Sequence, residues 1–159
     1  MNSSKIYKIL TTWRFLFFSI WKLPMVLIAG IRVKKLTKSQ AIVTVPYSYI
    51  NRNPFNSMYF AVEAMAAELS TGSLVLLHAE DKNISTLVLS LEAKYYKKAT
   101  TKITFFCNEG DKVLDSINEA SQTGLSTTCI LNSKGYDLSN NCVAEFTITW
   151  SLKKRSQSS

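Results

Sequence analysis

Two glutamates, Glu63 and Glu68, lie inside the most apolar stretch of the chain, residues 53–72 (NPFNSMYFAVEAMAAELSTG). A carboxylate in apolar surroundings is costly unless it is paired with a cation, protonated, or used in a reaction. The reactions open to such a group are proton transfer, as a general acid or base, and attack on an electrophile. The search for a functional site therefore begins at these two side chains.

The spacing of the two glutamates argues against a joint acid and base on one helix. They are five positions apart, which is about 140° around an α-helix, so they do not share a face. Glu68 has small or flexible residues at i−3, i−4 and i−7, namely Met65, Ala64 and Ala61. The alternative to a reactive role is that both glutamates form ion pairs with Lys or Arg of a neighbouring strand or subunit.

Residues 53–72 are predicted to form a buried helix. The stretch is apolar on every side, which is typical of a membrane span or of the centre of a fold. About fourteen helical residues are too few to cross a bilayer, which takes roughly twenty. We expect Asn56 or Ser57 to cap this helix and Gly72 to end it.

One amphipathic helix and several antiparallel strands are expected around the buried helix. Apolar residues recur at helical spacing over residues 5–21, and Lys22 and Pro24 argue against a membrane span over residues 15–31. We expect strands at residues 30–36, 41–47, 74–80, 84–98, 101–107, 125–132 and 141–152, with a turn at Lys134-Gly135 and a short helix or bulged strand at 110–121. Residues 1–28 are thus an N-terminal helix and connection, residues 29–152 the main domain, and residues 153–159 a polar basic tail.

The basic residues are unevenly distributed along the chain. Residues 1–62 carry nine Lys or Arg and no acidic residue, whereas the remainder carries ten basic and eleven acidic residues. Nucleic acid, an anionic membrane surface or a phosphate-bearing ligand could bind such a region, and the absence of a nucleic-acid-binding motif argues against the first. The N-terminal helix is expected to pack on its own domain, with a peripheral membrane contact as the alternative.

The three cysteines and the single histidine do not form a recognisable site. Cys107, Cys129 and Cys142 lack metal-ligand spacing, so we expect no metal site, and they fit reduced thiols of a cytoplasmic protein. His78 is interpreted as a hydrogen-bonded strand residue.

The order of the elements and several local motifs resemble the hotdog fold, and more specifically a thioesterase-like branch related to the phenylacetic-acid-degradation-type thioesterases. The matching segments are Asn53, residues 57–60 at the helix start, residues 61–68 running to Gly72, residues 92–98 (EAKYYKK) and residues 143–154. The resemblance implies an α+β fold in which a curved antiparallel sheet of five or six strands wraps around one long central helix, with an extra N-terminal helix. It also implies a homodimer whose sheets join edge to edge, and it leaves open a dimer of dimers.

The resemblance further implies hydrolysis of an acyl-CoA or acyl-carrier thioester at the dimer interface, without a cofactor. Glu68 matches the catalytic carboxylate of the family, and Asn53 would orient the carbonyl group or a water. Amides at the helix start, those of Met58 and Tyr59, would hold the oxyanion. The acyl chain would follow the strip formed by Ala61, Ala64 and Met65. The phosphates of coenzyme A would bind Arg52, Lys94, Lys97 and Lys98.

The helix start departs from the pattern of many relatives, which carry His-Gly-Gly there. The equivalent positions are Tyr59, Phe60 and Ala61, and their bulky side chains could block the oxyanion site. The alternative function is therefore a non-catalytic hotdog module that binds acyl chains or acyl-CoA.

Overall fold

The central helix begins later and runs further than the sequence pattern predicts. In the computed structural model, which describes residues 4–155, α4 spans Phe60–Ala79, and Gly72 lies in its interior. The prediction of a strand at residues 74–80 is wrong, because residues 74–79 form the C-terminal end of this helix. His78 therefore lies on α4, where its Nε2 is 2.7 Å from the carbonyl oxygen of Lys38. α4 is long and apolar enough to cross a membrane, but most of it is buried inside the fold.

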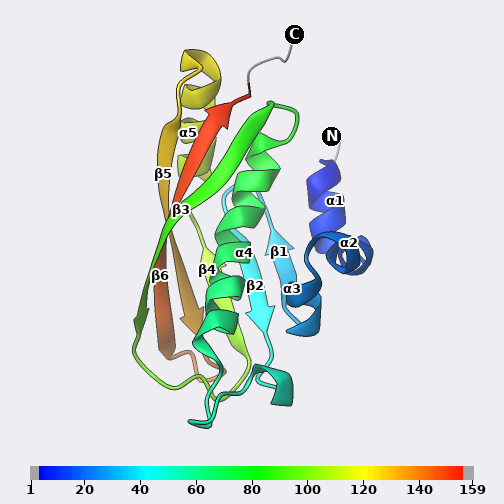
Figure 1. Ribbon diagram of the computed structural model, residues 1–159, viewed down its shortest axis with the longest axis vertical. Helices are drawn as coiled ribbons and strands as arrows, with labels where there is room; N and C mark the ends of the chain where they lie inside the picture. The colour runs from blue at the N-terminus through cyan, green and yellow to red at the C-terminus, as the bar shows by residue number, and fades with distance from the viewer. Residues whose placement is uncertain (1–3, 156–159) are drawn as a thin grey trace.

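Six strands form one antiparallel sheet that curves around α4 (Figure 1). In chain order they are β1 (Arg32–Leu36), β2 (Ala41–Val45), β3 (Ile84–Tyr95), β4 (Ile103–Cys107), β5 (Thr127–Tyr136) and β6 (Cys142–Lys154). Their order in the sheet is β1-β2-β4-β5-β6-β3, so β1 and β3 are the two edges. The α+β architecture with a curved sheet around one central helix is confirmed. β6 includes the first two residues of the expected tail, and residues 156–159 of that tail lie outside the described residues.

The core lies between the sheet and two helices. Every second side chain of a strand points to the same face, and on β6 this places Phe146, Ile148 and Trp150 against α4. The second helix, α5 (Gly110–Thr123), also contacts α4 and buries Val113 and Ile117. The alternatives for this segment are thereby resolved in favour of the amphipathic helix.

Gly135 lies inside β5 and not in a turn. A Cβ atom at Gly135 would be 2.5 Å from the Phe105 ring, so the glycine allows that ring to pack directly on the backbone. The turn between β5 and β6 comes later, where Oδ1 of Asp137 accepts hydrogen bonds from the N–H groups of Ser139 and Asn141, both at 2.9 Å. The turn expected at Lys134-Gly135 is therefore wrong.

Three short helices replace the single N-terminal helix that the sequence predicts. They are α1 (Lys5–Thr11), α2 (Arg14–Lys22) and α3 (Pro24–Ile28), and they lie together beside the β1 edge (Figure 1). The break between α1 and α2 falls at Thr12, whose backbone is extended and whose hydroxyl donates to the carbonyl of Lys8. The Glu80 carboxylate at the end of α4 holds α1 in place, since it accepts hydrogen bonds from the Ser4 hydroxyl and the Ile6 N–H.

β3 is a long edge strand with an irregular register. It pairs with β6 on one side only, and its exposed apolar residues include Leu87, Leu89 and Leu91, which are 63%, 55% and 40% exposed. A bulge between Val88 and Ser90 shifts the pairing by one residue. Leu87 and Leu91 therefore point to opposite faces, which corrects the single apolar face expected for residues 84–98.

Candidate active site

Asn53 organises the loop that leads into α4. Its Oδ1 accepts hydrogen bonds from the N–H groups of Phe55 (2.9 Å) and Ser57 (3.2 Å). Its Nδ2 donates to Oγ of Ser57 (3.0 Å) and to the carbonyl of Met58 (3.1 Å). These bonds use both hydrogens and both lone pairs of the amide. Asn53 is therefore a turn-forming residue with no free group for a substrate, which corrects the catalytic role expected for it.

The amides expected to hold an oxyanion are already used by the fold. The Met58 N–H donates to the carbonyl of Ala99, and the Tyr59 N–H donates to the carbonyl of Asn51, both at 2.7 Å. Asn51 ends the short 3-10 helix η1 (Tyr49–Asn51), and its buried side chain is held by carbonyl groups of Ala29 and Pro46. These contacts fix the path of the loop, so Met58 and Tyr59 are not the oxyanion donors.

The next two amides, those of Phe60 and Ala61, are free. They are the first residues of α4, whose N-cap residue is Tyr59 and not Asn56 or Ser57, and no side chain caps the helix. Neither N–H has a hydrogen-bond acceptor among residues 4–155. Unpaired amides at the start of a helix, together with the positive end of its dipole, favour a bound anion.

A pocket of about 340 Å³ lies between the start of α4 and residues 95–99. Its lining is mostly polar and includes Asn53, Ser57, Met58, Phe60, Glu63, Tyr95, Lys97 and Lys98. The pocket brings four of the sequence-predicted residues together, namely Asn53, Met58, Lys97 and Lys98. It also adds Glu63 and Tyr95, which were not among the predicted site residues, whereas Glu68 does not line it.

Glu63 is the buried carboxylate of this pocket. It is 3% exposed, and its Oε2 has no hydrogen-bond partner in the described part of the chain. Burial raises the pKa of Glu63 to about 7. The pKa of Tyr95 rises to about 12 because partial burial disfavours its charged form and because the charge of Glu63 is close. Glu63 is therefore in both protonation states near neutral pH.

Glu68 occupies a different face of α4, on a half-buried strip with Ala61, Ala64 and Met65. A Cβ atom at Gly72 would be 3.2 Å from Oε1 of Glu68 and 3.3 Å from the Trp150 ring, so Gly72 makes room for both side chains. The pKa of Glu68 is raised by burial. No ion pair or side-chain hydrogen bond to the Glu68 carboxylate occurs within residues 4–155. Pairing with Lys or Arg inside the chain, the alternative considered for both glutamates, is absent there.

The two glutamates differ in their distance from the free amides. Glu63 is three residues after Phe60, about 4.5 Å along the helix axis, whereas Glu68 is eight residues after it, about 12 Å. Within one subunit, only Glu63 is therefore close to the start of α4.

The four predicted phosphate-binding cations do not form one cluster. Lys97 forms an ion pair with Asp137 at 3.3 Å, and Nζ of Lys98 donates to the carbonyl of Phe55 at 3.0 Å. The Arg52 guanidinium lies over the Tyr49 ring, 5.3 Å from its centroid. Lys94 pairs in register with Glu145 on the face of the sheet away from α4. Only Lys97 and Lys98 line the pocket. Lys94 is the least suited of the four to bind the same ligand, because it lies on the face of the sheet away from α4.

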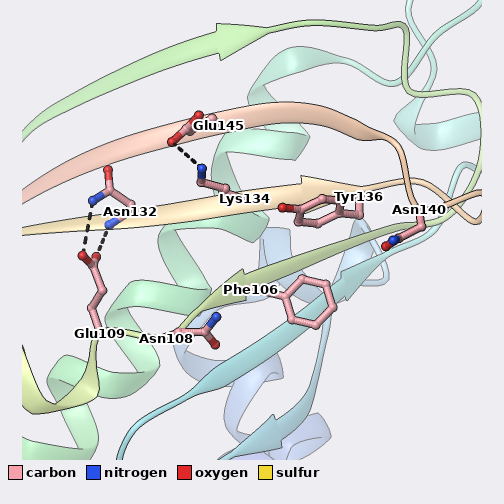
Figure 2. Close-up of a pocket in the computed structure, with 8 residues that line it drawn as sticks. All are labelled: Phe106, Asn108, Glu109, Asn132, Lys134, Tyr136, Asn140 and Glu145. Atoms are coloured by element: carbon pink, nitrogen blue, oxygen red, sulfur yellow. Dashed lines mark hydrogen bonds and ion pairs between the residues drawn. The ribbon is translucent and has the colours of Figure 1, made fainter.

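A larger cavity, of about 650 Å³, lies on the face of the sheet away from α4 (Figure 2). It forms where β4 and β5, which pair over three residues, move apart. In the sequence, α5 connects these two strands. Its charged groups have partners within the cavity lining, because Glu109 accepts hydrogen bonds from Asn132 and Glu145 pairs with Lys134 at 3.2 Å (Figure 2). No group of three potential metal ligands occurs within residues 4–155. The start of α4 is therefore the better candidate site.

Solved structures with the same fold include proteins described as thioesterases. A protein from Pseudomonas aeruginosa, described as of unknown function and a probable thioesterase, has a TM-score of 0.78 at 20% identity, with 88% of this chain and 93% of that chain covered. A protein of unknown function from Chlorobaculum tepidum has a TM-score of 0.75 at 16% identity, with 89% and 93% covered. A thioesterase from Haemophilus influenzae has a TM-score of 0.64 at 13% identity, with 87% and 88% covered. These likenesses confirm the hotdog fold.

Comparison at the sequence level gives the family. No curated protein matches the chain. Residues 11–152 match a family described as a domain of unknown function, DUF4442. The chain therefore belongs to the DUF4442 family and has the hotdog fold shared by structures described as thioesterases.

Proposed function

We propose that this protein hydrolyses an acyl thioester, carried by coenzyme A or by an acyl-carrier protein, at the start of α4. The observation that carries the proposal is the uncapped N-terminus of α4, where the amides of Phe60 and Ala61 have no acceptor among the described residues. Such amides stabilise the oxyanion that forms when a thioester carbonyl is attacked. The nearby pocket, with Lys97 and Lys98 on its wall, provides a place for the polar arm of the substrate.

We assign the reacting carboxylate to Glu68, acting across a homodimer. Glu68 is about 12 Å along α4 from the free amides of its own subunit, which is too far for it to act there. In the proposed dimer, a two-fold partner joins at β3, the edge strand, and the two α4 helices face each other along the half-buried strip that contains Glu68. Glu68 of the partner subunit then lies beside the thioester bound at Phe60 and Ala61.

The reaction requires one base and one anion site. Glu68 of the partner subunit takes a proton from water as the water oxygen attacks the carbonyl carbon, and the amides of Phe60 and Ala61 hold the resulting oxyanion. Collapse of this intermediate breaks the C–S bond and releases the acid, and the thiolate takes up the proton. The raised pKa of Glu68 makes it a stronger base than an exposed glutamate. The three free cysteines fit a reducing compartment such as the cytoplasm.

Glu63 is the competing candidate for the base, because it is close to the free amides within one subunit. The discriminating experiment measures thiol release from short, medium and long acyl-CoA substrates by wild type, Glu68→Gln and Glu63→Gln. We expect Glu68→Gln to lower kcat by about 10²-fold or more, because removal of a general base has effects of this size. Glu63→Gln should retain most of kcat. The opposite order would move the catalytic role to Glu63.

Acyl binding without hydrolysis is the second candidate function. It is favoured by the residues Tyr59 and Phe60, which are 46% and 56% exposed at the positions of the His and the first Gly of the His-Gly-Gly motif. This function gives saturable binding of acyl-CoA by wild type with no thiol release from any member of the panel. The same assay therefore separates the two functions.

A further inference from the structure

α2, its N-cap residue Trp13 and α3 expose a group of large apolar side chains to solvent. Trp21 is 84% exposed, Trp13 71%, Met25 59%, Phe17 57%, Ile28 55% and Ile20 48%. We refer to these six side chains as the N-terminal apolar surface. Four of them, Trp13, Phe17, Ile20 and Trp21, recur at i, i+4, i+7 and i+8 and therefore share one face of α2. An exposed patch of this size and composition commonly marks an interaction site.

The fold fixes the direction of this surface. Phe15 and Ser19 on the other side of α2 are buried, so α2 cannot turn its outer face inward without losing these contacts. The outer side chains are ordered against one another, since the rings of Trp13 and Phe17 meet edge to face at 5.5 Å. The Arg14 guanidinium lies 5.9 Å from the centroid of Trp13. The surface therefore projects outward as a unit.

Charge distinguishes between the partners that such a surface could have. Residues 1–62 contain nine basic residues and no acidic one, and Lys5, Lys8, Arg14 and Lys22 are exposed on α1 and α2. Two copies of this chain brought together through this region would repel each other. An anionic lipid surface attracts the same cations. Self-association also has a separate place, the β3 edge, at the opposite end of the sheet from β1 and the N-terminal helices.

We propose that the N-terminal apolar surface docks on the headgroup region of an anionic lipid bilayer. Interfacial helices bind in this way, with large apolar side chains in the headgroup and acyl boundary and with Lys or Arg beside the lipid phosphates. Tryptophan is favoured at this depth because its ring is apolar and its N–H is polar. Arg14 and Lys22 lie next to Trp13 and Trp21 in the sequence. The basic side chains and the tryptophan rings would therefore contact the membrane together.

The tryptophans give a direct measurement of docking. The chain has three, of which Trp13 and Trp21 belong to the surface and Trp150 is 6% exposed in the core. Full-length protein is titrated with phosphatidylcholine vesicles that contain phosphatidylglycerol and with vesicles of phosphatidylcholine alone. We expect a blue shift of the emission and co-sedimentation with the anionic vesicles, weaker by about tenfold or more with neutral vesicles or in 1 M salt.

Two paired variants make the test specific. Trp13→Ser with Trp21→Ser should reduce co-sedimentation with anionic vesicles by about tenfold or more. Leu125→Ser with Leu138→Ser removes two side chains that are 70% and 68% exposed elsewhere, and this variant should bind as wild type does. Circular dichroism checks that both variants are folded. The proposal would be overturned if wild type did not bind anionic vesicles, or if the tryptophan variant bound them as well as wild type does. Loss of a wild-type oligomer in the tryptophan variant, without vesicle binding by wild type, would assign the surface to self-association instead.

Discussion

Glu63 and Glu68 lie on one helix and have different surroundings. Glu63 is almost fully buried beside Tyr95, with an oxygen that has no partner in the described residues. Glu68 is half-buried on a strip of small side chains, in a space that Gly72 leaves open. Glu63 lines the pocket of its own subunit, whereas the role proposed for Glu68 requires a second subunit. This contrast supports different roles for the two residues.

Glu63 should make stability depend on pH in a specific direction. Its pKa rises from an ordinary value of 4.5 to about 7 on folding, so the folded state holds the extra proton between these values. Stability should therefore fall as pH rises through this window, by up to about 3 kcal/mol for full ionisation. Glu63→Gln removes the ionisation and should be more stable than wild type above pH 7, with the difference vanishing below about pH 4.5. Urea unfolding of both proteins from pH 4 to 8 measures this difference in the free energy of unfolding. A constant difference between the two proteins over this range would mean that Glu63 does not carry the effect.

The free amide of Phe60 can be removed without removing the helix. Proline is tolerated at the first helical position and has no N–H, and the extended backbone of Tyr59 (φ −68°, ψ 126°) suits a residue before proline. Phe60→Pro should lower kcat by about 10²-fold or more, as does the loss of other oxyanion donors. Phe60→Ala loses the same ring but keeps the N–H, and it should retain much more activity. Equal kcat values for the two variants would exclude this amide from the mechanism.

The residue-level site could be predicted only in part. The burial of Glu63 and the partial burial of Glu68 follow from the apolar sequence around them. The identity of the free amides does not, because it depends on where the loop passes Asn51 and Ala99, whose carbonyls accept from Tyr59 and Met58. The saturated hydrogen bonding of Asn53 depends on the same loop path.

At the scale of elements, two glycines caused the largest errors in prediction. Gly72 suggested a helix end and Gly135 a turn, because glycine is common at both. Each instead allows a close approach, of Glu68 and Trp150 in one case and of Phe105 in the other. The ring contacts, of Trp150 with Gly72 and of Phe105 with Gly135, join residues far apart in the sequence, so no local pattern reveals them. The buried helix follows from its apolar composition and the six observed strands from their sequence patterns, so these elements were predictable, whereas the extension of α4 beyond Gly72 was not.

The β3 edge should control the oligomeric state. An unpaired edge strand with exposed leucines can pair with a second copy, and a charged side chain on the edge opposes such pairing. Leu89 lies in the bulge of β3 and is 55% exposed. We expect Leu89→Lys to shift the protein from dimer to monomer in sedimentation velocity, with an unchanged circular dichroism spectrum. Leu125→Lys, at a residue that is 70% exposed and far from β3 in the sequence, is the control and should remain dimeric. A Leu89→Lys dimer as strong as wild type would place the interface elsewhere.

At the scale of the whole molecule, the two edges of the sheet have different neighbours. β1 lies beside α1, α2 and α3, in the part of the chain that carries the excess of basic residues, whereas β3 is open (Figure 1). This asymmetry leaves one edge for a second subunit and the other side for the lipid surface proposed above. The catalytic proposal depends on the first of these, because it requires residues from two subunits in each site.

Heterodimers with one defect in each subunit test this requirement most directly. A Glu68→Gln subunit paired with a Phe60→Pro subunit, isolated through two affinity tags, keeps one complete site if Glu68 acts across the interface. We expect about half of the wild-type thiol release per dimer. A subunit carrying both changes, paired with a wild-type subunit, should then release almost no thiol. The reverse pattern, with no activity in the first heterodimer and about half in the second, would show that each subunit uses its own Glu68 and would contradict the shared site.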